Sequence, residues 1–132
     1  MDALVGWAIG LHIATAHAGS LPDPGAHRAL MTPGIYAVAP SGLTFGAYRN
    51  SLSRTIRYPG ERVSAYAGWT WKAGDFGPAR DVRVTVAAVT GYVEPVSPLL
   101  GVSVKLWEGT SAPRVLWVPH RTQPVSLAWE FR

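Results

Sequence analysis

Residues 43–71, LTFGAYRNSLSRTIRYPGERVSAYAGWTW, contain the alternation that decides the fold. In residues 43–50 and again in 63–71, apolar or aromatic side chains alternate with small or polar ones. A two-residue period rich in aromatic and β-branched residues is typical of a strand with one buried face. Residues 51–62, between the two segments, are mostly polar and contain Pro59 and Gly60. The stretch therefore predicts a β-hairpin with a long, solvated connection at 51–62.

The same alternation recurs along the rest of the chain. Further strands are predicted at residues 4–15, 35–39, 81–90, 99–107, 114–118 and 125–131. Eleven prolines and fourteen glycines disfavour long helices and favour short strands joined by turns. A chain of 132 residues is one domain of ordinary size. We therefore expect residues 1–132 to form a single all-β domain, a small antiparallel up-and-down barrel of about eight strands, with an orthogonal sandwich as the alternative.

The N-terminal segment MDALVGWAIGLHIATAHA has some features of a secretory signal. It is apolar and ends with the small-residue spacing of a cleavage site. However, neither lysine nor arginine precedes the apolar run, and Asp2 has the wrong charge. We interpret residues 4–15 as the first strand, in which Trp7, Ile9 and Leu11 share one face with Val5 and Ile13.

The composition excludes several classes of function. Cysteine is absent, so neither disulfides nor thiolate chemistry are available. The net charge is +4, but the arginines are scattered along the chain, which argues against dedicated nucleic-acid binding. The four histidines match no zinc-binding spacing, so we predict neither a metal site nor a cofactor. The chain also lacks a glycine-rich phosphate loop and a nucleophile elbow.

Alternation alone does not say which face of the barrel points inward. The face of Tyr48 and Tyr66 is small and polar, as in the lumen of a membrane barrel or on the outside of a soluble one. Several predicted strands are shorter than the roughly 9–11 residues that cross a bilayer. We therefore expect a soluble or peripheral barrel with an apolar core, cytoplasmic or virion-associated, and keep an outer-membrane barrel as the alternative.

Several segments resemble known proteins when taken in order. GIYAVAP, LTFGAYRNS, SAYAGWTW and the closing SLAWEF, within residues 34–131, resemble the lipid A palmitoyltransferase family. That resemblance implies a small eight-stranded outer-membrane barrel. The segments AYRNS, SAYAGW and VTGY are more similar to a set of small uncharacterised proteins of bacteria and their phages, which carry no known activity.

The palmitoyltransferase resemblance implies a catalytic histidine on the first strand and an Asp-Ser pair at the end of a later one. His12 matches the histidine, and His17 matches it less well, while Asn50 and Ser51 match the pair. Asparagine cannot accept a proton or supply the negative charge that stabilises an imidazolium, which argues against catalysis. The candidate catalytic residues are thus His12, Asn50 and Ser51. The alternative is a hydrogen-bonded histidine and two ordinary turn residues.

Tyrosines and arginines supply a second candidate site. Its members are Tyr36, Tyr48, Arg49, Arg54, Tyr66 and Tyr92. Aromatic walls with polar tips suit a small molecule, and arginine makes paired hydrogen bonds to oxyanions. The alternative for these residues is core packing and a solvated loop. We predict a non-enzymatic phage-type or bacterial barrel that binds a small molecule, such as an anion, a lipid or a protein partner. The alternatives are a lipid A acyltransferase of the outer membrane, and a virion component or an inhibitor of a host defence protein.

Overall fold

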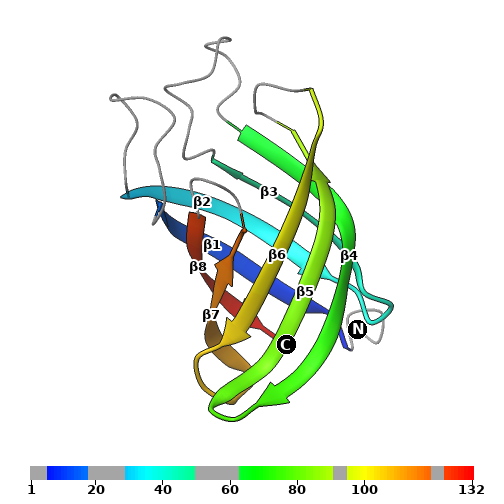
Figure 1. Ribbon diagram of the computed structural model, residues 1–132, viewed down its shortest axis with the longest axis vertical. Helices are drawn as coiled ribbons and strands as arrows, with labels where there is room; N and C mark the ends of the chain where they lie inside the picture. Colours follow the sequence, from blue (N-terminus) through cyan, green and yellow to red (C-terminus); the bar gives the residue numbers. More distant parts are fainter. Residues whose placement is uncertain (1–5, 18–28, 50–62, 91–94, 120–123) are drawn as a thin grey trace.

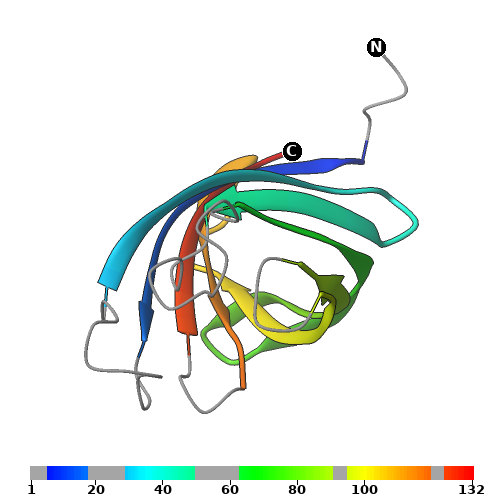
Figure 2. The ribbon, with the colours of Figure 1, turned by 90° about the horizontal axis from the view of Figure 1, so that it is seen from above.

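Eight antiparallel strands form one closed barrel in the computed structural model (Figure 1). The structure describes residues 6–17, 29–49, 63–90, 95–119 and 124–132. The strands are β1 (Ala8–His17), β2 (Ala29–Val38), β3 (Leu43–Arg49), β4 (Val63–Phe76), β5 (Ala79–Val89), β6 (Ser97–Lys105), β7 (Ser111–Trp117) and β8 (Pro124–Phe131). Each strand pairs with the next, and β8 closes the ring on β1 (Figure 2). The predicted up-and-down barrel is confirmed. No helix in these residues is long and apolar enough to cross a membrane.

Most strands lie where the alternation predicts them, but several are longer. β2 begins at Ala29, whereas the predicted strand began at residue 35. Pro33 is tolerated because it lies beside an irregularity in the β1–β2 pairing, where a ladder hydrogen bond is not required. β4 ends at Phe76 and β5 begins at Ala79, whereas the predicted strands ended at residue 71 and began at residue 81. Register shifts around Gly74 accommodate this glycine-rich stretch.

The first strand also differs from its prediction. It spans Ala8–His17, whereas residues 4–15 were expected, and residues 1–5 lie outside the described part. The predicted alternation of faces is confirmed as far as His12, but Ala8 is on the inner face and Leu11 on the outer one, the reverse of an apolar core. A register shift between His12 and Ala14 then reverses the alternation, so that Thr15 is buried in the lumen.

The barrel is polar inside and apolar outside, so the expectation of an apolar core was wrong. The buried apolar residues are mostly alanines, whereas the larger buried side chains are largely polar or charged and include Thr32, Glu130, Arg83 and Arg114. The large apolar side chains are instead on the outer face, and their exposed members include Leu11, Ile35, Phe45, Trp71, Leu100 and Leu127. The physical reason is that the interior charges come from different strands and neutralise one another once the ring closes.

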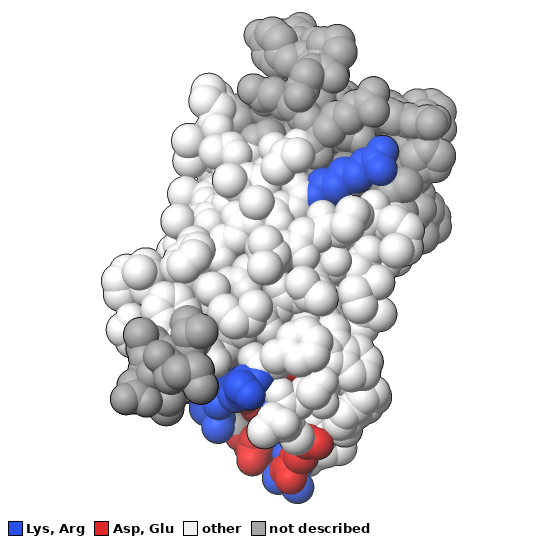
Figure 3. All heavy atoms as spheres, turned by 180° about the vertical axis from the view of Figure 1, so that it is seen from behind, with Lys and Arg blue, Asp and Glu red and all other residues white. Residues whose placement is uncertain are grey.

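The two ends of the barrel differ. At the end where β1 begins and β8 finishes, the strands are joined by residues 39–42, 77–78 and 106–110; we call this the termini end. At the opposite, distal end the connections are the longer segments 18–28, 50–62, 90–96 and 118–123. Exposed charges in the described residues are confined to the ends. They are Arg49 at the distal end and Lys72, Asp75, Arg80, Glu108 and Arg132 towards the termini end. Figure 3 shows the uncharged surface that separates them.

Candidate functional site

Four aromatic side chains from the predicted sites meet inside the barrel. His12 from β1 packs against Tyr36, Tyr48 and Tyr66, with ring centroids 5.0, 5.4 and 6.0 Å away. His12 Nε2 and the Tyr66 hydroxyl are 2.9 Å apart, within hydrogen-bond distance. We call these four side chains the aromatic layer. It links strands that do not pair with one another, because β1 and β4 are separated by β2 and β3.

Glycines provide the space for this layer. Along two rows of paired residues, large and small side chains alternate: Gly10–Tyr36–Gly46–Tyr66 and His12–Gly34–Tyr48–Ser64. A Cβ atom added at Gly10 would lie 2.0 Å from the Tyr36 ring. One added at Gly46 would lie 2.7 Å from both Tyr36 and Tyr66. The glycines are therefore gaps that the tyrosine rings fill.

Replacing Gly10 with alanine should lower the free energy of unfolding by about 1–3 kcal/mol, the usual cost of overpacking. The added methyl group requires the Tyr36 ring to move. Denaturant unfolding of the folded barrel measures the loss. Adding Tyr36→Ala should remove most of the effect of Gly10→Ala, because the ring that clashes is then absent. Strictly additive losses in this double-mutant cycle would show that the contact does not exist.

A second layer of side chains, all charged, lies next to the aromatic one. It consists of Asp81, Arg83, Arg114 and Glu130, from β5, β7 and β8, and we call it the charged layer. Arg83 donates two hydrogen bonds to the Asp81 carboxylate, at 3.2 and 2.7 Å. Arg114 Nη2 donates to Asp81 Oδ2 at 2.5 Å, and its Nη1 donates to the Asp81 carbonyl at 2.9 Å and to Ser103 at 3.0 Å. Two cations thus share one carboxylate.

Glu130 connects the two layers. Its Oε2 accepts a hydrogen bond of 2.5 Å from the Tyr36 hydroxyl and lies 3.4 Å from Arg114 Nε. Its Oε1 lies 3.0 Å from Arg83 Nη1, close enough for an ion pair but without hydrogen-bond alignment. Glu130 Oε1 and Arg114 Nε are therefore buried without a hydrogen bond among the described residues. The charged layer is neutral as a whole but incompletely hydrogen-bonded.

Hydroxyl groups form further contacts inside the barrel. Towards the distal end, Thr15 Oγ1 is 2.9 Å from both Thr32 and Ser126. Elsewhere, Thr70 is 2.7 Å from Thr44 and 2.8 Å from Thr85. The interior is consequently polar along much of its length, which an apolar core would not be.

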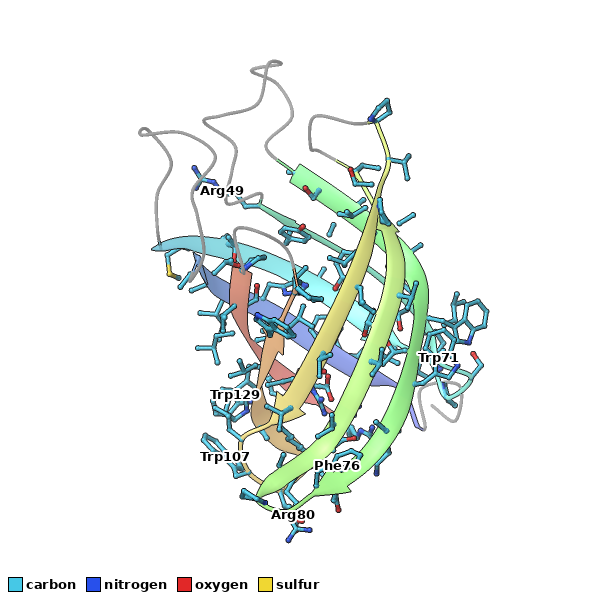
Figure 4. All side chains as sticks on the ribbon, viewed as in Figure 1. Arg49, Trp71, Phe76, Arg80, Trp107 and Trp129 are labelled. Carbon is cyan, nitrogen blue, oxygen red and sulfur yellow. The ribbon has the colours of Figure 1, made fainter. Side chains whose placement is uncertain are left out.

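Aromatic side chains gather on the outside near the termini end. Trp71, Phe76, Trp107 and Trp129 project outward there (Figure 4). Trp107 and Trp129 are in edge-to-face contact, with centroids 5.5 Å apart. Indole N–H groups donate to nearby turns: Trp129 to Ser111 Oγ at 2.6 Å, and Trp107 to the Ser111 carbonyl at 3.3 Å. These rings have one polar attachment and an exposed apolar body.

The structure accounts for only part of the predicted sites. His12, Tyr36, Tyr48 and Tyr66 meet in the lumen, whereas Arg49 is exposed at the end of β3. The remaining candidates lie outside the described residues; they are Asn50, Ser51, Arg54 and Tyr92. In the part of the chain that the structure describes, no three His, Asp or Glu side chains gather in a way that suits a metal ion.

The charged layer was missed by the sequence analysis, although a signal for it exists. Arg83, Arg114 and Glu130 each occur within a strand, on the face that carries the smaller side chains. A charged residue on that face of a single strand is uninformative. Two arginines and a glutamate on that face of three strands predict ion pairs inside a closed barrel. No protein-family model, curated protein or solved structure matches the chain.

Proposed function

We propose that the protein is an integral membrane β-barrel that binds its ligand or partner at one end. Two layers of side chains close its lumen. The observation that carries this proposal is the inverted polarity of the barrel. A water-soluble barrel buries its apolar faces, whereas a membrane barrel turns them towards lipid and keeps its interior polar. Here Arg83, Arg114 and Glu130 are inside, and large side chains such as Leu100 are outside.

The amount of exposed apolar surface supports the same conclusion. Monomeric soluble proteins rarely expose a contiguous apolar patch larger than a few hundred Å². In this protein the exposed apolar side chains come from all eight strands, so they surround the cylinder. A bilayer covers such a band without requiring any protein partner.

The ends of the barrel fit this placement. Outer-membrane barrels have short turns on one side of the membrane and longer loops on the other, with aromatic girdles at the interfaces. The termini end has the short connections and the outward-facing aromatic side chains, including Trp71, Trp107 and Trp129. Indole rings favour the membrane–water boundary because one edge is polar and the body is apolar. β4, with fourteen residues, and β5, with eleven, are long enough to span a bilayer.

Binding at the distal end remains our proposed activity. The aromatic and charged layers join non-neighbouring strands through the lumen, which does not suit an open pore for large solutes. The distal connections are the longest in the chain, and Arg49 stands at their edge. A ligand with a negative charge, or a protein partner with an acidic surface, would complement this arginine.

Flotation with lipid vesicles tests the membrane assignment. After refolding in the presence of phospholipid vesicles, we expect the protein to float with the lipid in a density gradient and to resist extraction by carbonate or high salt. Refolding without detergent or lipid should give aggregates. A monodisperse monomer in plain buffer would reject the proposal.

The inverted polarity also favours a second function, the acyl transfer to lipid A that the palmitoyltransferase resemblance implies, because that chemistry needs a membrane barrel. His12 is adjacent to Tyr48, two residues before the candidate pair Asn50 and Ser51. If the enzyme hypothesis holds, membranes containing the protein transfer a labelled acyl chain from phospholipid to lipid A, and His12→Ala and Ser51→Ala each abolish the transfer. Equal background transfer in all three preparations would exclude it.

A further inference from the structure

We propose that the charged layer is the closed gate of a path for small anions along the barrel axis. This activity goes beyond the binding role and rests on the proposed membrane location. Three observations carry it: the burial of four charges in the lumen, their incomplete hydrogen bonding, and their link to the aromatic layer through Tyr36.

Filling a lumen with ion pairs carries a high desolvation cost. The side chains of Arg83, Arg114 and Glu130 are each at most 5% exposed, and that of Asp81 is 13% exposed. Replacing buried ion pairs with well-packed apolar side chains is often neutral or stabilising, so stability alone does not explain a charged plug. An ionic plug has one property that an apolar plug lacks. When its pairs separate, charged groups are left that water and ions can solvate.

The layer has an alternative arrangement within reach. Lys72 Nζ is 4.0 Å from Asp81 Oδ1 and its side chain is 64% exposed, so it is positioned to take over the carboxylate from an arginine. Arg114 Nε and Glu130 Oε1 already lack hydrogen bonds, which lowers the cost of leaving their present positions. Two arrangements of similar energy are what a gate requires.

Tyr36 couples the charged layer to the aromatic layer above it. Its hydroxyl donates to Glu130, while its ring packs against His12 and directly over Gly10. When Glu130 moves or loses its charge, the Tyr36 hydroxyl loses its hydrogen bond to the charged layer. Because the same side chain also packs against His12, its movement carries the change in the charged layer into the aromatic layer.

The charges that remain determine which ions pass. Without the charge of Glu130, two arginines face a single carboxylate, Asp81, in the lumen. Lys72 lies beside this carboxylate towards the termini end. Rings of basic side chains favour anions in pores. The open state should therefore conduct chloride better than potassium.

Planar-bilayer recordings in a potassium chloride gradient test the gate. Wild-type protein should remain closed with rare, brief openings. Glu130→Gln keeps the side-chain volume but removes the charge that holds Arg83 and Arg114. Glu130→Gln should raise the fraction of time that the channel is open by about tenfold or more, which is the ratio expected for the loss of one hydrogen bond to a charged group. The reversal potential should lie towards that of chloride. The control is Glu108→Gln, which makes the same change at an exposed turn residue and should behave like wild type.

Two further measurements keep the test decisive. Vesicle flotation of every variant measures membrane insertion separately. If the wild-type protein fails to insert, the proposed membrane location is contradicted, whereas the gate is tested only on protein that has inserted. Tyr36→Phe removes only the hydroxyl that anchors Glu130 and keeps all four charges, so it should fold even if Glu130→Gln does not. It should also increase the open time. If inserted Tyr36→Phe, and any inserted Glu130→Gln, are as silent as wild type, the gate is rejected.

Discussion

Replacing Arg114 with alanine should lower the free energy of unfolding by about 3–5 kcal/mol, because removing one partner leaves buried charges uncompensated. Arg114 hydrogen-bonds the Asp81 carboxylate, the Asp81 carbonyl and Ser103, and it lies 3.4 Å from Glu130. Without it, Arg83 is the one buried arginine of the charged layer left beside two carboxylates on different strands, because Lys72 is largely exposed. Denaturant titration of the barrel refolded in detergent micelles or vesicles measures the loss.

An exposed arginine provides the matched control for Arg114. Arg80 also pairs with an aspartate, Asp75, at 3.3 Å, but both side chains are about half exposed. Exposed ion pairs contribute at most about 1 kcal/mol, so Arg80→Ala should have little effect. Similar losses for the two variants would mean that the charged layer is solvated and that the lumen is open to water.

Replacing Leu100 with arginine should prevent stable insertion into a bilayer. Leu100 is near the middle of β6 on the outer face and is 47% exposed. An arginine on the lipid face of a membrane barrel costs about 2–4 kcal/mol at the bilayer midplane. The fraction of protein that folds into vesicles and floats with them should therefore fall sharply for Leu100→Arg.

The same substitution at the end of the barrel separates the lipid effect from an effect of arginine itself. Leu106 follows β6 in a turn at the termini end and is 53% exposed, so it is at least as accessible as Leu100. Leu106→Arg should insert like wild type, because the side chain reaches water. In a water-soluble protein both positions would be ordinary surface sites, and each variant would change stability by no more than about 0.5 kcal/mol. Normal folding of Leu100→Arg in plain buffer would support that alternative.

The strands could be predicted from the sequence because alternation is a local property. β3 and β8 lie within one residue of the segments predicted from residues 43–50 and 125–131. The errors occur where non-local pairing overrides local signals. The predicted strand began at residue 35, yet β2 runs through Pro33 because β1 has its irregularity opposite. The phase of β1 after His12 was unpredictable for the same reason.

The direction in which the faces point could not be read from alternation. A strand with one apolar and one polar face has the same pattern whether the sheet curls towards the first face or the second. What decides here is that Arg83, Glu130 and Asp81 fall on one side of a closed ring in a register that lets them pair. That register depends on bulges and strand ends, which the sequence specifies only weakly.

The candidate site was partly predictable. Tyr48 and Tyr66 share a face in the hairpin pattern, and the observed pairing brings them and His12 into contact. Their grouping follows from strand parity. The hydrogen bond from Tyr36 to the charged layer could not be predicted in this way, because Glu130 is 94 residues from Tyr36 in the chain. The roles of Asn50 and Ser51 remain predictions.

Fluorescence quenching of the tryptophans tests the central claim, that the outer face contacts lipid, most directly. Trp69, Trp71, Trp107 and Trp117 are each 41–54% exposed. In vesicles, lipids brominated on their acyl chains should quench much of the emission, and aqueous iodide should quench it less than in the unfolded protein. Emission that iodide quenches fully and brominated lipids leave unchanged would show that the apolar face is turned towards water, and would contradict the membrane barrel.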